Sequence, residues 1–367
     1  MKKQTSATTE TGIKGKTVID FTGKIIYVGI DVHLKDYQAA KVYNGICLGN
    51  HRMQASSEAL IKHLRTHYPG ARFKCVYESC AWGFELQRKL TAAGMECIVV
   101  NAADVSTTDK ERRRKTDKVD ALKLARSYES GELEAIHVPD ETLQKERNIV
   151  RYKRSLVEDI TRSKNRLKSL LKYHGIDLPE QYAKNNWSAN FMQWAAQQAA
   201  KDELLGDTLL LLLEQVKLLR QLLLKTEHKL RELSRGKYAP QASLAMSVPG
   251  IGQNTAMLFL LEAGDVRRFD NFDALNDYVG LCPDTDSSGE TERDRGITTR
   301  GNKQLRSAMI EAAWLAIRKD PALLESYQLL TKRMKGTQAI VRIARKLLRR
   351  LRCVLISGIP YQKGIVG

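Results

Sequence analysis

The sequence lacks a segment that could cross a membrane or direct export. Its unbroken apolar runs, such as the leucines at 209–213, are far shorter than the ~20 residues that a membrane-spanning helix needs. Lys2 and Lys3 are followed by Thr, Ser and Glu, whereas a secretory signal would continue with an apolar stretch. We therefore predict a cytoplasmic protein with no membrane partner.

Cysteine is scarce and has no recognisable spacing. None of the six cysteines forms a Cys-x-x-Cys pair or lies in a His-rich neighbourhood, which excludes a zinc cage of the usual kind. We expect these thiols to be reduced and mostly buried.

Acidic residues are in the minority. The chain has 60 Lys and Arg against 42 Asp and Glu, and the resulting net charge of +18 attracts polyanions. Its 367 residues, 43% of them hydrophobic, allow two or three domains and exclude wholesale disorder. Nucleic acid is the first partner that this composition suggests.

A regular order of strands and helices follows a polar tail at residues 1–22. Three strand-like runs come first, and Asn44-Gly45, a strong hairpin signal, separates the second from the third. Helical and strand patterns then alternate, which predicts a ribonuclease-H-like α/β domain over residues 23–138. The expected strands are 25–31, 37–43, 46–53, 73–77 and 95–100, and the expected helices are 57–68, 82–93 and 117–130.

Four carboxylates fall where this fold would gather them. Asp31 ends the first strand, Glu78 follows the fourth, and Asp117 and Asp120 are three residues apart on the last helix. Such an oxygen-rich edge suits Mg²⁺, with Mn²⁺ as an alternative, and metal ions there would activate an attacking oxygen and stabilise a leaving one. Taken singly, each acid is equally consistent with a cap or a solvated surface position.

Basic residues beside the last two carboxylates would hold phosphates near such a metal. A solvated loop is the alternative explanation for a charge run of this kind. The run comprises Lys110, Arg112, Arg113, Arg114, Lys115 and Lys118.

Two long helical patterns occupy residues 139–238. The first, at about 141–173, is basic and amphipathic, and the second, at about 202–234, has the alternating three and four spacing of a coiled-coil seam. We expect them to pair as an antiparallel coiled-coil arm whose apolar edge meets another subunit.

A mainly helical third region is predicted over residues 239–358. The turn at 248–252 is similar to a helix-hairpin-helix turn, in which Gly250 and Gly252 would let backbone N–H groups approach a phosphate; a plain connector fits equally well. Helices are expected at 303–317 and at 332–353, and the second has nine basic residues and no acidic one. Arg345 and Arg349 are its candidate nucleic-acid ligands.

The stretch between these helical patterns contains a candidate nucleophile. Ser287 and Ser288 precede Gly289 in a loop that runs from a Pro turn to a basic Gly-Asn corner, although such a sequence is more often only a turn. The candidate phosphate ligands around it are Arg295, Arg300, Asn302 and Arg306.

As a set, these motifs resemble the insertion-sequence-110 family, the DEDD transposases related to the pilin-gene invertase. The resemblance covers nearly all of residues 24–356. The segments that carry it are Gly29-Ile30-Asp31-Val32-His33, Tyr77-Glu78-Ser79, Lys115-Thr116-Asp117-Lys118-Val119-Asp120-Ala121, Pro249-Gly250-Ile251-Gly252 and the block from Ser288-Gly289 to Gly301-Asn302.

The resemblance implies a bacterial, nucleoid-associated DNA recombinase with a RuvC-type N-terminal domain. It implies that Asp31, Glu78, Asp117 and Asp120 bind the metal and that Ser288, which directly precedes the glycine, attacks DNA to form a phosphoserine link. It also implies a non-coding bridge RNA that pairs with donor and target DNA, and dimers that assemble into tetramers for exchange through a Holliday junction. Serine needs a base or a metal to activate it, so the carboxylates and the serine would form a composite site.

Two other functions are consistent with parts of the sequence. A metal-dependent Holliday-junction-type nuclease would use the carboxylates alone, with water as the nucleophile and no protein adduct. A non-catalytic DNA- or RNA-binding protein would use the acids only structurally. The serine loop argues against the first and the fourfold carboxylate set against the second.

Overall fold

The computed structural model describes residues 20–105, 116–183, 187–288 and 291–363. The chain divides into two compact units, the first ending at Val138 and the second beginning at Pro139. In the described parts of the chain, no helix has the length and apolar character needed to span a bilayer.

The N-terminal unit is built on a mixed five-stranded sheet with the order β3-β2-β1-β4-β5. β1 and β2, and β2 and β3, pair antiparallel, whereas β1 and β4, and β4 and β5, pair parallel. The predicted α/β order is thereby confirmed, and it is consistent with a ribonuclease-H-like domain. The strands are β1 (Ile25–Val32), β2 (Asp36–Tyr43), β3 (Ile46–Gln54), β4 (Arg72–Glu78) and β5 (Glu96–Val100).

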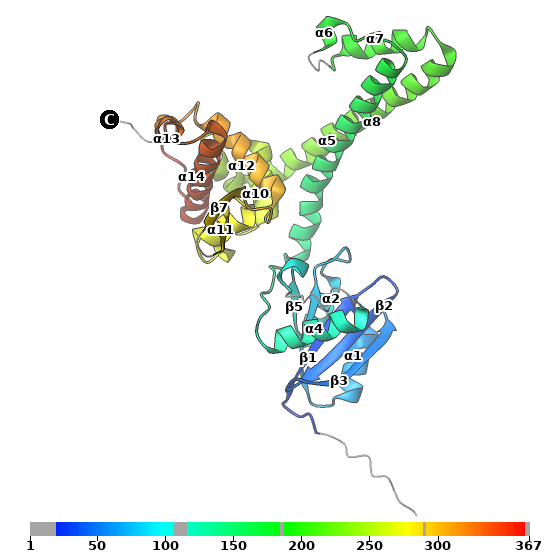
Figure 1. Ribbon diagram of the computed structural model, residues 1–367, viewed down its shortest axis with the longest axis vertical. Helices are drawn as coiled ribbons and strands as arrows, with labels where there is room; N and C mark the ends of the chain where they lie inside the picture. Colours follow the sequence, from blue (N-terminus) through cyan, green and yellow to red (C-terminus); the bar gives the residue numbers. More distant parts are fainter. Residues whose placement is uncertain (1–19, 106–115, 184–186, 289–290, 364–367) are drawn as a thin grey trace, which may run out of the picture. The chain divides into compact units, whose positions relative to one another are not determined.

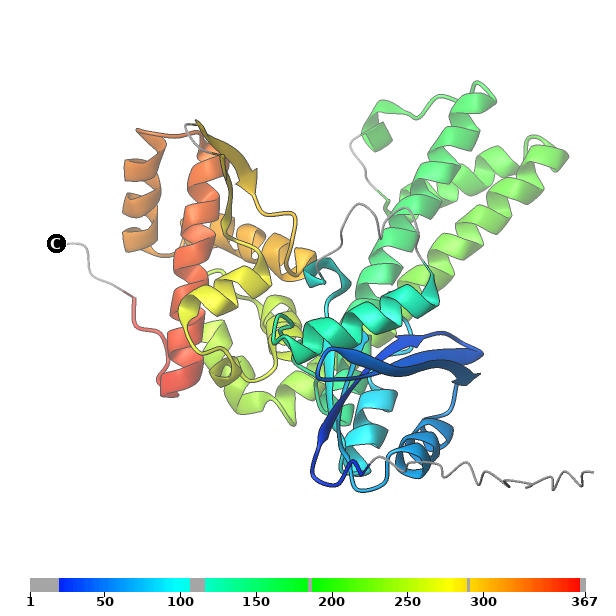
Figure 2. The same ribbon diagram turned by 60° about the horizontal axis from the view of Figure 1, so that its bottom comes forward.

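Helices cover both faces of this sheet (Figure 2). On one face, Ile26, Val28 and Ile30 of β1 pack against leucines of α1 (Ser57–His67) and α2 (Glu85–Ala92). On the other face lies α4 (Asp117–Glu129), which approaches so closely that a Cβ on Gly29 would lie 2.0 Å from the Ala121 carbonyl oxygen. Alternate residues of β1 thus face different helices, as the pleat of a strand requires.

Two 33-residue helices begin the second unit, α5 (Glu141–Tyr173) and α8 (Glu203–Arg235). They pack side by side and antiparallel (Figure 1), because Lys153 pairs with Glu227 and Ser163 with Gln215. Leu167 and Leu171 meet α7 (Ala189–Ala199) and the first half of α8 in one buried cluster. The short α6 (Glu180–Ala183) precedes α7.

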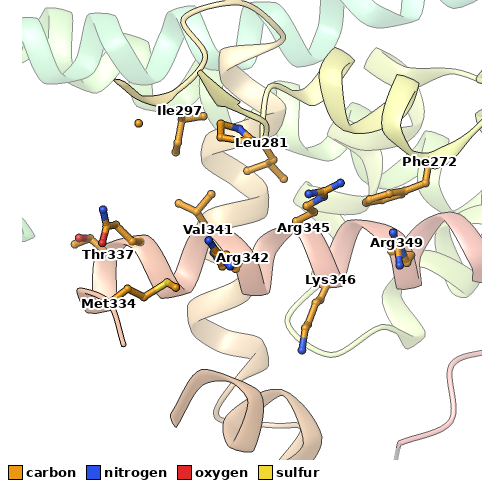
Figure 3. Close-up of a pocket in the computed structure, with 13 residues that line it drawn as sticks. Phe272, Leu281, Ile297, Met334, Thr337, Val341, Arg342, Arg345, Lys346 and Arg349 are labelled. Atoms are coloured by element: carbon orange, nitrogen blue, oxygen red, sulfur yellow. The ribbon is translucent and has the colours of Figure 1, made fainter. Parts of the chain in front are cut away.

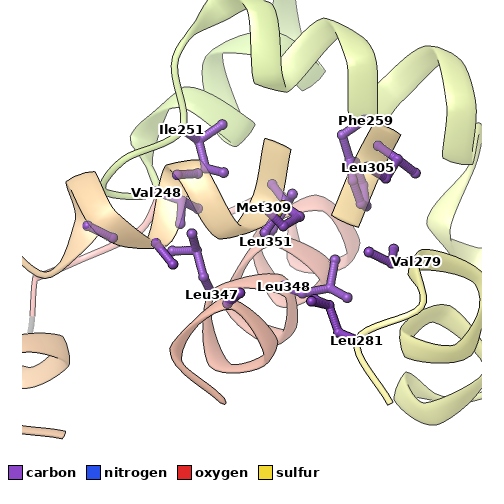
Figure 4. Close-up of a cluster of buried hydrophobic side chains, with 14 of the residues drawn as sticks. Val248, Ile251, Phe259, Val279, Leu281, Leu305, Met309, Leu347, Leu348 and Leu351 are labelled. Atoms are coloured by element: carbon purple, nitrogen blue, oxygen red, sulfur yellow. The ribbon is translucent and has the colours of Figure 1, made fainter. Parts of the chain in front are cut away.

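The rest of the second unit is a helical domain around one core (Figure 4). Its central helix, α14 (Gly336–Ser357), buries Leu347, Leu348 and Leu351 against Met309 of α12. The predicted basic helix at 332–353 therefore starts later and ends later than expected. The other elements are α9 (Ala239–Ser247), α10 (Gln253–Ala263), α11 (Phe272–Val279), β6 (Pro283–Ser288), β7 (Thr291–Ile297), α12 (Lys303–Ala316) and α13 (Pro321–Thr331), with the 3-10 turn η2 (Val266–Arg268). A further 3-10 turn, η1 (Ala102–Asp104), belongs to the N-terminal unit.

The expectation that the cysteines are mostly buried is wrong. All six are free thiols, but only Cys75 and Cys97, which lie on the parallel strands β4 and β5, are buried. The sheet interior takes up small apolar side chains, whereas the remaining cysteines lie at strand ends, in loops or on the outer face of α14.

Candidate active site

The acidic edge of the N-terminal unit is built from the ends of two parallel strands and the first turn of a helix. Asp31 follows Gly29 by two residues, so its side chain lies on the face of the sheet that α4 covers. Asp117 and Asp120 lie in the first turn of α4, where the positive end of the helix dipole favours carboxylates. The three acids therefore converge on one corner of the unit.

Polar contacts fix the start of α4 at this corner. The Thr116 hydroxyl caps the helix by accepting from the Val119 N–H at 3.4 Å. The Asn50 side chain, on β3, donates to the Lys118 carbonyl at 2.7 Å. Gly29 of β1 also lies directly against the backbone of α4, so the first turn of the helix has little freedom to move away from β1.

The geometry at the corner is that of a candidate metal site. In the described part of the chain, Asp31, His33 and Asp117 form a group whose potential ligand atoms all lie within 4.8 Å of one another. Burial raises the pKa of Asp31 above its ordinary range, and the nearby carboxylates of Asp117 and Asp120 add to the rise, while His33 opposes it. A divalent cation would offset the repulsion between carboxylates that are held this close together, so these residues fit a metal ion.

His33 is the member of the group that the sequence analysis did not single out. Its Nε2 lies 3.2 Å from Asp31 Oδ2 and 3.7 Å from Asp117 Oδ2. The spacing in the sequence indicates this position, because His33 follows Asp31 by two residues at the end of the same strand and therefore tends to point to the same side. Its imidazole can orient Asp31 or carry a proton at this edge.

Glu78 is the fourth predicted ligand. In the parallel register Ile30 lies opposite Tyr77, which places Glu78 beside the position of Asp31 at the end of β4. It is two residues beyond Val76, which packs toward α4, so Glu78 lies on the same face as Asp31. Among the described residues, the tight group of Asp31, His33 and Asp117 includes neither Glu78 nor Asp120.

The predicted serine loop is a β-hairpin. β6 and β7 pair antiparallel, and Ser288 is the last residue of β6, opposite Thr291 of β7. The sequence predicts a loop here, and the described residues on either side of it pair as two polar antiparallel strands. Gly289 lies outside the described residues, and Arg295 is placed only by its backbone in β7.

Two of the candidate phosphate ligands are used within the protein. The Asn302 side chain caps α12 by accepting from the N–H groups of Gln304 and Leu305, and it donates to Glu262 at 3.2 Å. Arg306 donates to the carbonyl oxygens of Thr298 and Arg300. Both side chains thus hold the segment that leads out of the hairpin, and Arg300 lies exposed within that segment.

The glycines of the 248–252 turn have different surroundings. Gly250 has a φ of +84°, and a Cβ there would lie 2.2 Å from the Ala312 carbonyl oxygen on α12. Gly252 begins α10, and a Cβ there would meet nothing within 4 Å. Close packing against α12 is therefore sufficient to explain Gly250, whereas the space beside Gly252 is open to a ligand.

The remaining basic candidates divide into two groups. Arg345 donates to Asp273 at 2.7 Å, and the Arg349 guanidinium lies 4.5 Å from the centre of the Phe272 ring. Arg112, Arg113, Arg114 and Lys115 lie outside the described residues.

Comparison with known proteins assigns the chain. Residues 28–175 match the DEDD family of the IS110 type, described as "Transposase", and residues 242–328 match the "Transposase IS116/IS110/IS902 family". The chain belongs to the IS110 family of transposases. The transposase therefore acts on DNA, and its DEDD domain implies the use of a divalent metal at the acidic edge.

Curated relatives of the transposase share low identity over most of their length. A putative transposase of Sinorhizobium fredii is 29% identical over 319 residues, which cover 82% of this chain and 73% of the relative. The transposase for insertion sequence element IS1533 of Leptospira borgpetersenii is 24% identical, with 79% and 84% covered. The pilin gene-inverting protein of Moraxella bovis is 26% identical, with 92% and 98% covered.

A buried polar cluster in the transposase joins its long helix to the hairpin domain. The Glu262 carboxylate on α10 is 1% exposed and accepts from Arg151 of α5 at 2.7 and 2.9 Å. Arg147 donates to the Leu261 and Glu262 carbonyl oxygens, and Asn302 also donates to the Glu262 carboxylate. No sequence pattern indicates this cluster, because the arginines of α5 and Glu262 of α10 are more than a hundred residues apart and each resembles an ordinary surface charge.

Proposed function

We propose that this transposase is an RNA-guided DNA recombinase that cleaves and exchanges strands through Ser288. One observation carries the proposal: the chain combines a convergent acidic edge with a separate hairpin whose first strand ends on a serine. The inverting activity named for the Moraxella bovis relative is of the same reaction class.

Strand cleavage would begin with the Ser288 hydroxyl. Its oxygen attacks a backbone phosphorus, the bond from phosphorus to one deoxyribose oxygen breaks, and that oxygen leaves with a proton. The serine proton passes to a carboxylate of the acidic edge, with His33 hydrogen-bonded to Asp31 as an adjoining proton carrier. Attack by the released hydroxyl of the exchanged strand then reverses the step and frees the serine, so no energy-rich cofactor is needed.

Asp31, Glu78, Asp117 and Asp120 would hold the divalent cation, Mg²⁺ or Mn²⁺. When bound, the ion supplies Lewis-acid stabilisation of the charge that develops on the phosphate oxygens. The carboxylates belong to the first unit and the serine to the second, and the proposal requires both to act on the same phosphate.

A bridge RNA would supply sequence recognition by pairing with donor and target DNA. In this proposal the protein's side chains contact the phosphate backbone of the nucleic acids, which the net charge of +18 favours. The candidate contacts are Arg112, Arg113, Arg114, Lys115, Gly250, Gly252, Arg295, Arg300, Asn302, Arg306, Arg345 and Arg349. Dimers would assemble into a tetramer, in which exchange passes through a Holliday junction.

The decisive test is a search for a nucleotide on serine. The protein is isolated from cells that carry the element's flanking DNA, denatured, treated with nuclease and digested for mass spectrometry. We expect a nucleotide on the peptide containing Ser288, none in Ser288→Ala, and an adduct retained in the matched variant Ser287→Ala. Cleavage that persists in Ser288→Ala would end the serine mechanism.

The second candidate function is a metal-dependent junction nuclease. The convergence of Asp31, His33 and Asp117 favours it, because such a group can activate water without any help from the hairpin. It predicts metal-dependent cleavage with free ends and no adduct on any serine, so the same experiment separates the two functions.

A further inference from the structure

A groove of about 710 Å³ lies in the second unit between the base of the β6–β7 hairpin and α14 (Figure 3). Pro283, at the start of β6, and Ile297, at the end of β7, line one side. Val341 and Arg342 line the other side, from α14. A space of this size accommodates a ligand of about one or two nucleotides.

The groove combines an apolar floor with a cationic rim. Leu281, Val341 and Phe272 form the apolar part, and Arg342, Arg345 and Arg349 supply the positive charge. The Arg349 and Arg345 guanidiniums lie 4.5 and 5.7 Å from the centre of the Phe272 ring. In Figure 3, Phe272 from α11 and the two arginines from α14 lie toward the same end of the groove.

We propose that this groove binds unpaired nucleotides of the DNA strand that Ser288 cleaves. The proposal rests on the proposed function for its choice of DNA, and it adds a site for the flanking bases that nothing in the recombinase chemistry assigns.

The chemistry of the lining favours an unpaired strand over a duplex. A duplex keeps its bases stacked inside and presents phosphates, so it has no use for an apolar floor. An unpaired base has a free π-face, which stacks on an aromatic ring or a guanidinium, while its phosphate meets the cations at the rim. Asp273 opposes an anion locally, but it is already paired with Arg345.

The position of the groove favours DNA over RNA. Pro283 and Ser288 are the two ends of β6, so a strand in the groove lies within about 17 Å of the proposed nucleophile. That span corresponds to a few nucleotides of an extended strand. The groove would thus hold the bases beside the scissile phosphate open and in register with the serine.

Photocrosslinking of the full-length Ser288→Ala protein tests the site without requiring cleavage. The probes are an iododeoxyuridine-labelled 12-nucleotide single strand, the same sequence as a duplex, and the same sequence as RNA. We expect the single-stranded DNA to crosslink most strongly, with the crosslink on peptides that contain Phe272 or residues 334–349. Equal or stronger crosslinking of the duplex or the RNA at these peptides would overturn the proposal.

Two substitutions with a matched control identify the contacts. Arg342→Glu should lower the affinity for the single strand by about tenfold, and Phe272→Leu, which keeps an apolar core contact, should lower it about fivefold or more. The control, Arg318→Glu, makes the same charge change at an exposed residue outside the groove. An equal loss in Arg318→Glu, or none in Arg342→Glu, would show that the groove is not the site.

The crosslinking experiment can be interpreted independently of the test for a phosphoserine adduct. If no phosphoserine adduct forms but the single strand still crosslinks in the groove, the chain is a nuclease that opens its substrate there. If the adduct forms and the groove does not crosslink, the serine mechanism stands and this proposal fails.

Discussion

The acidic edge and the serine hairpin are held in place in different ways. At the edge, the end of β1 carries Asp31 and the capped start of α4 carries Asp117 and Asp120, and a close backbone contact at Gly29 joins the strand to the helix. At the hairpin, side chains hold the segment between β7 and α12: Asn302 donates to Glu262 on α10, and Arg306 donates to the carbonyl oxygens of Thr298 and Arg300. Damage to the edge should therefore remain local, whereas damage to the hairpin's supports should spread through its domain.

The largest expected effect is on the chemistry of the edge. Asp31→Asn should reduce metal-dependent cleavage by roughly 10³-fold or more, because the amide no longer supplies the charge that holds the metal. Cleavage assays and calorimetric titration with Mn²⁺ measure both consequences. The control is Asp36→Asn, on the neighbouring strand, whose carboxylate pairs with Arg52.

The same variant should leave the fold intact. Because the folded pKa of Asp31 is raised, the metal-free protein loses stability as the pH rises through that carboxyl's folded pKa, above its usual value of 3.8. Asp31→Asn should remove that loss, so its melting temperature at pH 7 should equal or exceed that of the wild type. A clear drop in melting temperature would mean that Asp31 is a structural residue.

A loss of about 3 to 5 kcal/mol in the stability of the second unit is expected for Glu262→Ala. The change removes the Glu262 carboxylate that pairs with Arg147, whose side chain is 10% exposed, and with Arg151, whose side chain is about half exposed. Differential scanning calorimetry of the full chain measures it, and the transition of the first unit should not move. Arg151→Met removes a half-exposed partner and should lower the stability by less than Glu262→Ala does. An equal loss in the two variants would contradict the central position of Glu262.

Gly250→Ala separates packing from phosphate binding in the 248–252 turn. We expect a loss of about 2 to 4 kcal/mol, because the new Cβ would meet the backbone of Ala312 and Ala316 at a positive φ. Gly252→Ala has room for its methyl group and should change stability little. Weaker DNA binding in Gly252→Ala without a change in melting temperature would instead support a phosphate contact at this turn.

The smallest expected effect concerns the cap of α4. Thr116→Ala should cost about 1 kcal/mol and should weaken Mn²⁺ binding, because the first turn that holds Asp117 and Asp120 frays. Ser56→Ala removes the cap of α1 at a similar cost in stability and should leave Mn²⁺ affinity unchanged. If both variants bind the ion equally well, the start of α4 does not depend on its cap.

The strands, helices and acidic edge of the first unit could be predicted from the sequence because the patterns that indicate them are local. Alternation and the Asn44-Gly45 turn, where both residues have positive φ, specify the strands and their hairpin. Strand ends and the spacing of Asp117 and Asp120 then place the acids on one edge. His33 was not singled out, although its place two residues after Asp31 indicates the same side of the strand, because a single histidine at a strand end has no periodic signature of its own.

The second unit was predicted less well because its contacts are long-range. The strands β6 and β7 are polar and short, so periodicity gave no reason to expect a hairpin. Glu262 follows an apolar run and would be read as the polar end of a helix, although Arg147 and Arg151 bury it. Only the pairing of α5 with α10, which no local pattern encodes, makes it a buried ion.

The two glycines at the foot of the hairpin touch each other. A Cβ on Gly301 would lie 2.7 Å from the Gly280 Cα, so the chain leaves the helical domain and returns to it at nearly the same point. Of the described residues between them, Leu281 is buried in the helical core, and the rest of the segment forms a closed loop. A change in the length of the β6–β7 hairpin would therefore alter the distance that the serine reaches while the two ends of the loop stay together.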